Sequence, residues 1–135
     1  MEIEKNKLEY LSVNEIKSYA KNMRTHSKEQ VDKICDSIKQ FGFTNPILID
    51  KDNVIIAGHG RLEAAKKMRI KTVPCIRLSG LNEDQVRALR IADNQLALNA
   101  GWDFEMLKIE LDALQTASFD LQFTGFSETE LTDIM

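Results

Sequence analysis

The residues best suited to chemistry lie between positions 54 and 65, in the segment VIIAGHGRLEAA. A β-branched run at 54–57 meets residues 58–61, Gly-His-Gly-Arg, here called the GHGR turn, and a helical pattern follows. Glycines permit a tight turn and a close approach of the backbone to a ligand. The first turn of a helix carries unpaired N–H groups and the positive end of its dipole. The segment therefore predicts an anion site, which the Arg61 guanidinium could bind in a bidentate way.

The spacing within the GHGR turn is not specific on its own. It lacks the Gly-x-x-x-x-Gly-Lys-Ser/Thr pattern of a P-loop and the third glycine of the dinucleotide-binding fingerprint. An ordinary strand-to-helix turn, with glycines for geometry and a solvated Arg61, accounts for the same residues. His59 adds a donor that can be neutral or charged near pH 7.

Length and composition are typical of a single globular domain. The chain has 135 residues, of which 43% are hydrophobic and 29% charged, which excludes a disordered chain. No apolar run approaches the ~20 residues of a membrane helix. The charged N-terminus, MEIEKNKLEY, lacks the apolar segment of a signal peptide, so we expect a cytoplasmic protein with no membrane partner. Cys35 and Cys75 lack metal-ligand spacing and are expected to be buried free thiols.

Charge is distributed unevenly along the chain, whose net charge is −3. Residues 1–60 are neutral overall, residues 61–102 carry a net charge of +4, and residues 103–135 carry −7. The basic middle favours a phosphate-bearing ligand, although a solvated helix face accounts for its lysines equally well. The acidic balance of the whole chain disfavours a free-standing DNA-binding protein.

Local patterns predict an α+β fold, in which a small mixed β-sheet with interleaved helices is followed by a helical C-terminal portion. Strands are predicted at residues 7–13, 46–49, 54–57 and 74–78, with a hairpin turn at 50–53. Helices are predicted to begin after Ser27, after the GHGR turn, at Asn82, at Trp102 and after Ser127. We also expect an extended link at 119–126 and a core or interdomain contact for Trp102.

Three segments, found in this order, resemble the ParB/sulfiredoxin superfamily: SIKQFGFTNPILID at 37–50, AGHGRLEAAKKM at 57–68 and RIADNQLALNAGWD at 90–103. The first is similar to the family's helix–Gly-x-x-x-Pro–strand element. The second is similar to its nucleotide-phosphate motif, and the third to its Glu-Asn-rich box. The resemblance covers about residues 7–100 and implies a ParB/sulfiredoxin-like fold that binds a nucleotide.

Differences from the superfamily's patterns indicate which of its members this chain resembles most. Sulfiredoxins carry a catalytic cysteine where this chain has His59, so a sulfinic-acid reductase is disfavoured. Chromosome-partitioning ParB proteins carry Gly-Glu-Arg-Arg there; Arg61 keeps the last arginine, but His59 and Gly60 replace Glu and Arg, so the nucleotide (ATP, ADP or CTP) stays open. The Gly-His-x-Arg form resembles free serine kinases and the ParB-like, nuclease-like N-terminal domains of phage and prophage proteins. The latter are often fused in front of a DNA methyltransferase.

The C-terminal link DLQFTGF at 120–126, followed by an acidic helix, most resembles these methyltransferase-associated proteins. We therefore expect a nucleotide-binding core at residues 1–100 and a helical C-terminal extension at residues 101–135. In such proteins the extension leads to a fused domain, so we expect that the native chain could continue beyond residue 135.

The resemblance implies three groups of site residues. Nucleotide phosphates are expected at Gly58, His59, Gly60 and Arg61, with Asn22 and Arg24 from a matching Asn-x-Arg loop. Asp93 and Asn94 align with the family's Glu-Asn pair and are expected to hold Mg²⁺ through the nucleotide. Phe43, Thr44, Asn45 and Pro46 are expected to flank the base or ribose. The alternatives are two polar helix positions for the pair, an exposed loop around residues 22–26, and simple turn chemistry at 43–46.

The leading hypothesis for function is a ParB-like domain that binds a nucleoside triphosphate with Mg²⁺ and serves DNA transactions. It would be a DNA-engaging or regulatory module of a phage or mobile-element protein, such as a DNA modification methylase. The first alternative is a small kinase or NTPase of the serine-kinase type, with Asp93, His59 or Glu15 as candidate base. The second is a protein-interaction domain with a degenerate site, and no carboxylate cluster favours a nuclease. Expected partners are a nucleotide, DNA through another domain or protein, and a second copy in a homodimer.

Overall fold

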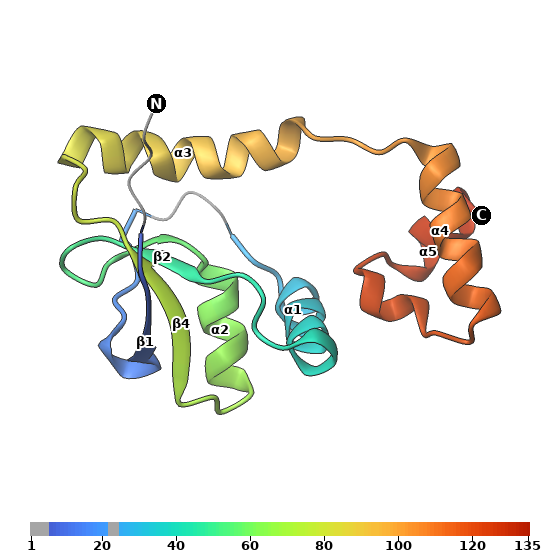
Figure 1. The fold of residues 1–135 in the computed structure, drawn as a ribbon, viewed down its shortest axis with the longest axis horizontal. Coiled ribbons are helices and arrows are strands. Elements are labelled where there is room, and N and C mark those ends of the chain that lie inside the picture. Colours follow the sequence, from blue (N-terminus) through green and yellow to red (C-terminus); the bar gives the residue numbers. More distant parts are fainter. Residues whose placement is uncertain (1–5, 22–24) are drawn as a thin grey trace.

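The fold is α+β, as the sequence predicts. The computed structural model describes residues 6–21 and 25–135. In chain order the elements are β1 (Leu8–Ser12), the 3₁₀ turn η1 (Val13–Glu15), α1 (Lys28–Phe41), β2 (Ile47–Ile49), β3 (Ile55–Ala57), α2 (His59–Lys67), β4 (Thr72–Arg77), α3 (Glu83–Asn99), α4 (Phe104–Thr116), the 3₁₀ turn η2 (Leu121–Thr124) and α5 (Glu128–Ile134). The sheet and the first three helices precede a separate group of C-terminal helices (Figure 1).

The four strands form one mixed sheet in the order β1-β4-β2-β3. Strand β4 pairs antiparallel with β1 and parallel with β2, whereas β2 and β3 form the predicted antiparallel hairpin. The Asp50 carboxylate stabilises the hairpin turn, because its Oδ1 accepts hydrogen bonds from the backbone N–H groups of Asp52 at 2.8 Å and Val54 at 3.0 Å. This hairpin brings the end of β3, and therefore the GHGR turn, to an edge of the sheet.

The core is built from β-branched strand residues and small helix residues. Ile47, Ile49, Ile55 and Val73 are fully buried in the sheet, and Leu62 and Ala65 of α2 pack against them. Ala64, on the adjacent face of α2, packs against Val31 and Cys35 of α1. Alanine at 64 and 65 lets α2 lie close to both the sheet and α1, which fixes the start of α2 relative to α1. Cys35 and Cys75 are buried free thiols, as predicted.

Helix α3 begins on the core and extends beyond it (Figure 1). Its first half buries Val86 and Arg90, whereas Ile91, Leu96 and Leu98 in its second half are exposed. The Asn82 side chain accepts a hydrogen bond from Gln85 N at 2.8 Å, and the Gln85 side chain accepts one from Asn82 N at 2.9 Å. This reciprocal cap defines where the helix begins, and so the register of its polar residues over β3.

Asn82→Ala is expected to lower the free energy of unfolding by about 1 kcal/mol, because the Gln85 backbone N–H loses its side-chain acceptor and the reciprocal cap is broken. Urea denaturation of the purified chain measures this change. Asn82→Ser is the matched control, since serine keeps an acceptor at the cap and should stay close to wild type. Equal stability of wild type and Asn82→Ala would show that the cap does not hold α3.

The C-terminal helices form a small cluster around Leu111, whose side chain is buried. Trp102 is 60% exposed and touches the Phe126 ring with a centroid distance of 5.6 Å, so the predicted core role for Trp102 is wrong. The predicted extended link at 119–126 is also wrong, because Leu121–Thr124 forms a 3₁₀ turn. Asp120 caps this turn, and Gly125 ends it in a left-handed conformation. The turn contacts α1, which ties the C-terminal helices to the core.

None of the helices in the described part of the chain is long and apolar enough to cross a membrane.

Candidate functional site

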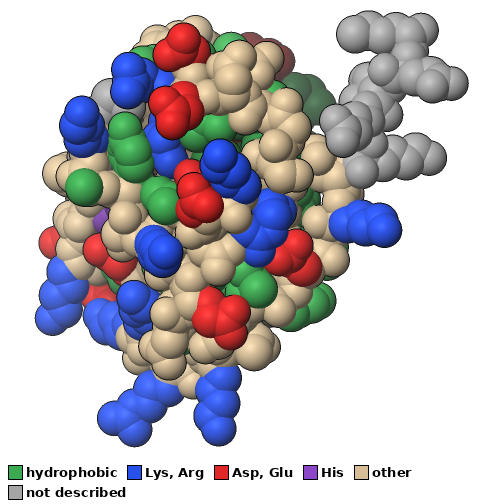
Figure 2. All heavy atoms as spheres, turned by 90° about the vertical axis from the view of Figure 1, so that its left-hand side faces the viewer, with side chains coloured by type: hydrophobic (Ala, Val, Ile, Leu, Met, Phe, Trp, Pro, Cys, Tyr) green, Lys and Arg blue, Asp and Glu red, His purple; other side chains and the backbone are tan. Residues whose placement is uncertain are grey.

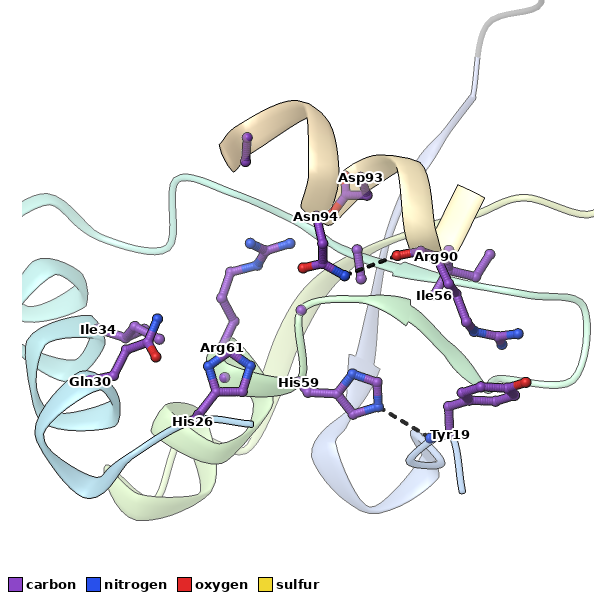
Figure 3. Close-up of a pocket in the computed structure, with 14 residues that line it drawn as sticks. Tyr19, His26, Gln30, Ile34, Ile56, His59, Arg61, Arg90, Asp93 and Asn94 are labelled. Carbon is purple, nitrogen blue, oxygen red and sulfur yellow. Dashed lines mark hydrogen bonds between the residues drawn. The ribbon is translucent and has the colours of Figure 1, made fainter. Parts of the chain in front are cut away.

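A pocket of about 250 Å³ opens where the GHGR turn meets the starts of α1 and α2 and the middle of α3 (Figure 3). Its lining comes from four separate segments of the chain: Tyr19, His26, Gln30, Ile34, Ile56, Ala57, Gly58, His59, Gly60, Arg61, Arg90, Asp93, Asn94 and Ala97. The structure therefore brings together all four residues of the GHGR turn with both Asp93 and Asn94, which the sequence analysis places in one site.

Both glycines of the GHGR turn are required by its geometry. Gly58 has φ +114°, and a Cβ built there would lie 3.1 Å from Ile47 Cγ1 and 3.2 Å from Arg61 Nε. A Cβ on Gly60 would lie 2.9 Å from Ile34 Cδ1 and 3.0 Å from His26 Nδ1. The first glycine lets the chain reverse from β3 into α2, and the second lets α1 and His26 lie directly against the start of α2.

Arg61 is partly buried at the side of the pocket, so it is not the solvated side chain of an ordinary turn. Its Nη2 donates a hydrogen bond to the Pro46 carbonyl at 3.0 Å, while its Nε is buried and has no partner among the described residues. Burial lowers the pKa of Arg61, and the Asp93 carboxylate counteracts that shift. A guanidinium held at the pocket wall, with one donor that no described residue accepts from, is suited to bind an anion.

Two histidines lie beside the GHGR turn. His59 Nε2 accepts a hydrogen bond from the backbone N–H of Tyr19 at 3.2 Å, which only an unprotonated Nε2 can do. Burial lowers the pKa of His59, and the nearby His26 and Arg90 lower it further. His26 Nδ1 is buried without a partner among the described residues. His26 was noted in the sequence only as part of a loop, and its packing on Gly60 brings it into the site.

The lowered pKa of His59 predicts how stability depends on pH. In the unfolded chain His59 titrates near its ordinary pKa of about 6.5 and takes up protons that the folded state resists. Its contribution is therefore complete above about pH 6.5 and is lost as the pH falls through the lower folded pKa. Relative to His59→Gln, which cannot titrate, wild type should therefore lose stability as the pH falls below about 6.5. Urea denaturation at several pH values checks this, and a constant difference between the two proteins would contradict it.

Helix α3 supplies Asp93, Asn94 and an arginine that the sequence analysis did not select. Asn94 Nδ2 donates a hydrogen bond to the Arg90 carbonyl at 2.9 Å, which fixes the amide beside the pocket. Arg90 is only 8% exposed, and its Nε donates to the Ile55 carbonyl at 3.2 Å. Its position one helical turn before Asp93 and Asn94 was the available signal for its place in the site.

The described residues contain no group of three or more His, Cys, Asp and Glu side chains that could hold a metal ion by themselves. Asp93 is the carboxylate in the pocket lining, and the amide of Asn94 is next to it in sequence. This donor set fits Mg²⁺ only when ligand phosphates complete the coordination, because Mg²⁺ is commonly bound through one or two carboxylates and substrate phosphates.

Other residues selected from the sequence lie elsewhere. Phe43, Thr44 and Asn45 line a neighbouring groove that shares Arg61, Gln30 and Ile34 with the pocket, and Pro46 offers the carbonyl that Arg61 contacts. Glu15 is exposed in η1 and lies outside the pocket lining. Asn22 and Arg24 lie outside the described residues.

The side of the molecule at the left of Figure 1 carries both basic and acidic side chains. Figure 2 shows that basic and acidic side chains are interspersed there among the described residues. Alternating charge of this kind does not form the continuous basic track that a nucleic-acid backbone requires.

Two curated proteins show the relation to known sequences. The chain is 54% identical over 82 residues to the ParB-like nuclease domain-containing protein YnaK of Escherichia coli (strain K12), covering 61% of this chain and 94% of YnaK. It is 31% identical over 74 residues to the probable chromosome-partitioning protein ParB of Campylobacter jejuni, covering 53% of this chain and 26% of that protein. It thus spans nearly all of the first relative and about a quarter of the second.

Solved structures show the same fold. The C-terminally truncated ParB from Caulobacter crescentus complexed with CTP-gamma-S superimposes with a TM-score of 0.74 at 21% identity, over 96% of this chain and 77% of that one. Sulfiredoxin from Arabidopsis thaliana has a TM-score of 0.52 at 24% identity, over 62% of this chain and 96% of that one. These likenesses confirm the predicted ParB/sulfiredoxin-like fold.

Family comparison divides the sequence into two matching regions. Residues 105–135 match the ParB-methyltransferase HTH domain, which agrees with the predicted resemblance to methyltransferase-associated proteins. Residues 1–95 match the ParB N-terminal domain, and this region contains the sheet, α1, α2 and every residue of the pocket lining except Ala97. Together with the fold and the arrangement of the GHGR turn, this match shows that the chain belongs to the ParB N-terminal domain family.

Proposed function

We propose that this chain binds a nucleoside triphosphate with Mg²⁺ and serves DNA transactions as a regulatory or DNA-engaging module of a phage or mobile-element protein, such as a DNA modification methylase. One observation carries the proposal: Arg61, whose buried Nε has no partner among the described residues, lines a pocket formed at the start of α2. A helix start and a guanidinium directed to the same place favour a phosphate group. The likeness to a ParB complexed with CTP-gamma-S supports a nucleotide as the source of that phosphate.

In this proposal each part of the site has a separate task. The backbone N–H groups of the GHGR turn and the Arg61 guanidinium bind phosphate oxygens. Asp93, with Asn94 beside it, holds Mg²⁺ that is also bound by those phosphates. The groove at Phe43, Thr44 and Asn45 adjoins Arg61 and receives the ribose or base. The ion would neutralise phosphate charge beside the Asp93 carboxylate.

The proposed division of the chain is a nucleotide-binding core at residues 1–100 and a helical extension at residues 101–135. The extension matches an HTH domain, yet residues 103–135 carry one lysine, no arginine and eight acidic residues. Such a surface repels DNA phosphates, and non-specific DNA affinity depends on neutralising them. We therefore propose that contact with DNA needs a further domain or a partner protein.

Isothermal titration calorimetry of the purified chain with ATP, ADP, CTP and GTP, each with Mg²⁺, tests the proposal. We expect saturable binding that selects one base and is weaker without Mg²⁺. Absence of heat from all four at millimolar concentration would overturn nucleotide binding and favour a protein-interaction domain. If inorganic triphosphate bound as tightly as the nucleotides, the phosphate site would be supported but a base-selective groove would be rejected.

A further inference from the structure

Tyr19 is held at two points, although it lies in an irregular segment before α1. Its backbone N–H donates to His59 Nε2 at 3.2 Å. Its ring lies under the Arg90 guanidinium, with 3.6 Å between Arg90 Cζ and the ring centroid. Figure 3 shows the three side chains at the same end of the pocket. A cation placed over an aromatic ring at this distance is an attractive contact that fixes the orientation of both groups.

Arg90 itself is held in place by two further contacts. Its Nε donates to the Ile55 carbonyl at 3.2 Å, and its Nη2 lies 3.8 Å from Asp50 Oδ2. Asp50 is held in turn by the β2–β3 hairpin, because its other carboxylate oxygen accepts two backbone hydrogen bonds. The Tyr19 ring therefore contacts Arg90, which is itself bonded to the sheet, and this contact fixes the position from which the Tyr19 N–H donates to His59.

The hydrogen bond from Tyr19 selects the tautomer of His59. A neutral imidazole has one N–H donor and one acceptor nitrogen, so an Nε2 that accepts a hydrogen bond leaves the proton on Nδ1. The charged and titratable groups around this ring are His26 before α1, Glu63 on α2, and Arg90 on α3. Burial, His26 and Arg90 all disfavour a second proton on the imidazole, and this keeps Nε2 free to accept the hydrogen bond.

We infer that Tyr19 and Arg90 are positioning residues that hold His59 as its Nδ1–H tautomer, so that His59 offers a hydrogen-bond donor to an anionic ligand at the GHGR turn. The part concerning the ligand rests on the proposed function, whereas the tautomer is a property of the ligand-free chain. Outer partners of this kind commonly set which imidazole nitrogen carries the proton.

Long-range ¹H–¹⁵N NMR spectra of the His59 imidazole test the inference at about pH 7.5, above the ordinary histidine pKa. Wild type should show the proton on Nδ1. Tyr19→Ala, which removes the ring contact with Arg90, should shift the population toward the Nε2–H tautomer. Tyr19→Phe is the matched control, since it keeps both the ring and the backbone N–H and should match wild type. A wild-type Nε2–H tautomer, or an unchanged tautomer in Tyr19→Ala, would overturn the inference.

A second measurement separates this inference from the proposed function. Titration with ATP and Mg²⁺ should give about tenfold weaker binding for Tyr19→Ala and wild-type affinity for Tyr19→Phe. A wild type that binds no nucleotide but has Nδ1–H would overturn the proposed function and leave the positioning role intact. A wild type that binds ATP with Nε2–H would overturn the positioning role alone. If Tyr19→Ala does not fold, Tyr19→Leu, which keeps an apolar side chain but has no aromatic face for Arg90, should show the same shift toward Nε2–H, and an unchanged tautomer there would overturn the inference.

Discussion

Arg61→Ala is expected to weaken nucleotide binding by about 100-fold or more. In the proposed complex this side chain supplies charge-assisted hydrogen bonds, each of which contributes about 1.5–3 kcal/mol, and its buried Nε has no partner among the described residues. The free energy of unfolding should fall by only about 1 kcal/mol, because the bond from Arg61 Nη2 to the Pro46 carbonyl is lost. Calorimetric titration and urea denaturation measure the two effects on the same protein.

Arg87→Ala is the control for Arg61→Ala, because Arg87 is an exposed arginine on α3 outside the pocket lining. It removes the same charge and should change neither the free energy of nucleotide binding nor the free energy of unfolding by more than about 0.5 kcal/mol. Full retention of nucleotide affinity in Arg61→Ala would remove Arg61 from the binding site. Complete unfolding of Arg61→Ala would instead show that the arginine is structural.

Gly58→Ala is expected to reduce stability and nucleotide binding together. Residue 58 has φ +114°, a conformation that alanine adopts only with strain of about 1–3 kcal/mol. The new methyl group would also lie 3.1 Å from Ile47 Cγ1 and 3.2 Å from the Arg61 guanidinium, so Arg61 must move. We expect a loss of about 2–3 kcal/mol in the free energy of unfolding, measured by urea denaturation, and at least tenfold weaker nucleotide binding.

Gly101→Ala is the matched control, because a Cβ at residue 101 meets no atom within 4 Å and no positive φ is required there. Its stability should stay within about 0.5 kcal/mol of wild type, with unchanged nucleotide affinity. Similar losses in the two variants would mean that the effect at Gly58 is a general cost of replacing glycine. A tolerated Gly58→Ala would contradict the described geometry of the GHGR turn.

Much of the fold could be predicted from the sequence because its signals are local. Ser27, Asn82 and Ser127 each cap a helix at the predicted place, and the β-branched residues at 47–49 and 54–57 form the β2–β3 hairpin. The error at residues 119–126 has a physical origin. One turn of 3₁₀ helix is too short to produce a hydrophobic period, and its ends depend on Asp120 and Gly125.

The candidate site could be predicted only in part. The GHGR turn is contiguous in sequence, so its glycines and Arg61 are recognisable before the fold is known. The contacts of Tyr19 with His59 and Arg90 join three distant segments, and no local pattern encodes them. Trp102 lies before the start of α4 and is exposed, although residue type alone favours burial, and the buried side chain of α4 is that of Leu111.

The most direct test of the central claim is a backbone ¹H–¹⁵N NMR titration of the chain with ATP and Mg²⁺, or with whichever nucleotide calorimetry selects. If the GHGR turn binds phosphate, the largest shifts should fall on the amides of His59, Gly60 and Arg61, with smaller ones at His26 and Asn94. Arg61→Ala should abolish these shifts at the same nucleotide concentration. Shifts confined to other surfaces, or none at saturating nucleotide, would contradict a phosphate site at the GHGR turn.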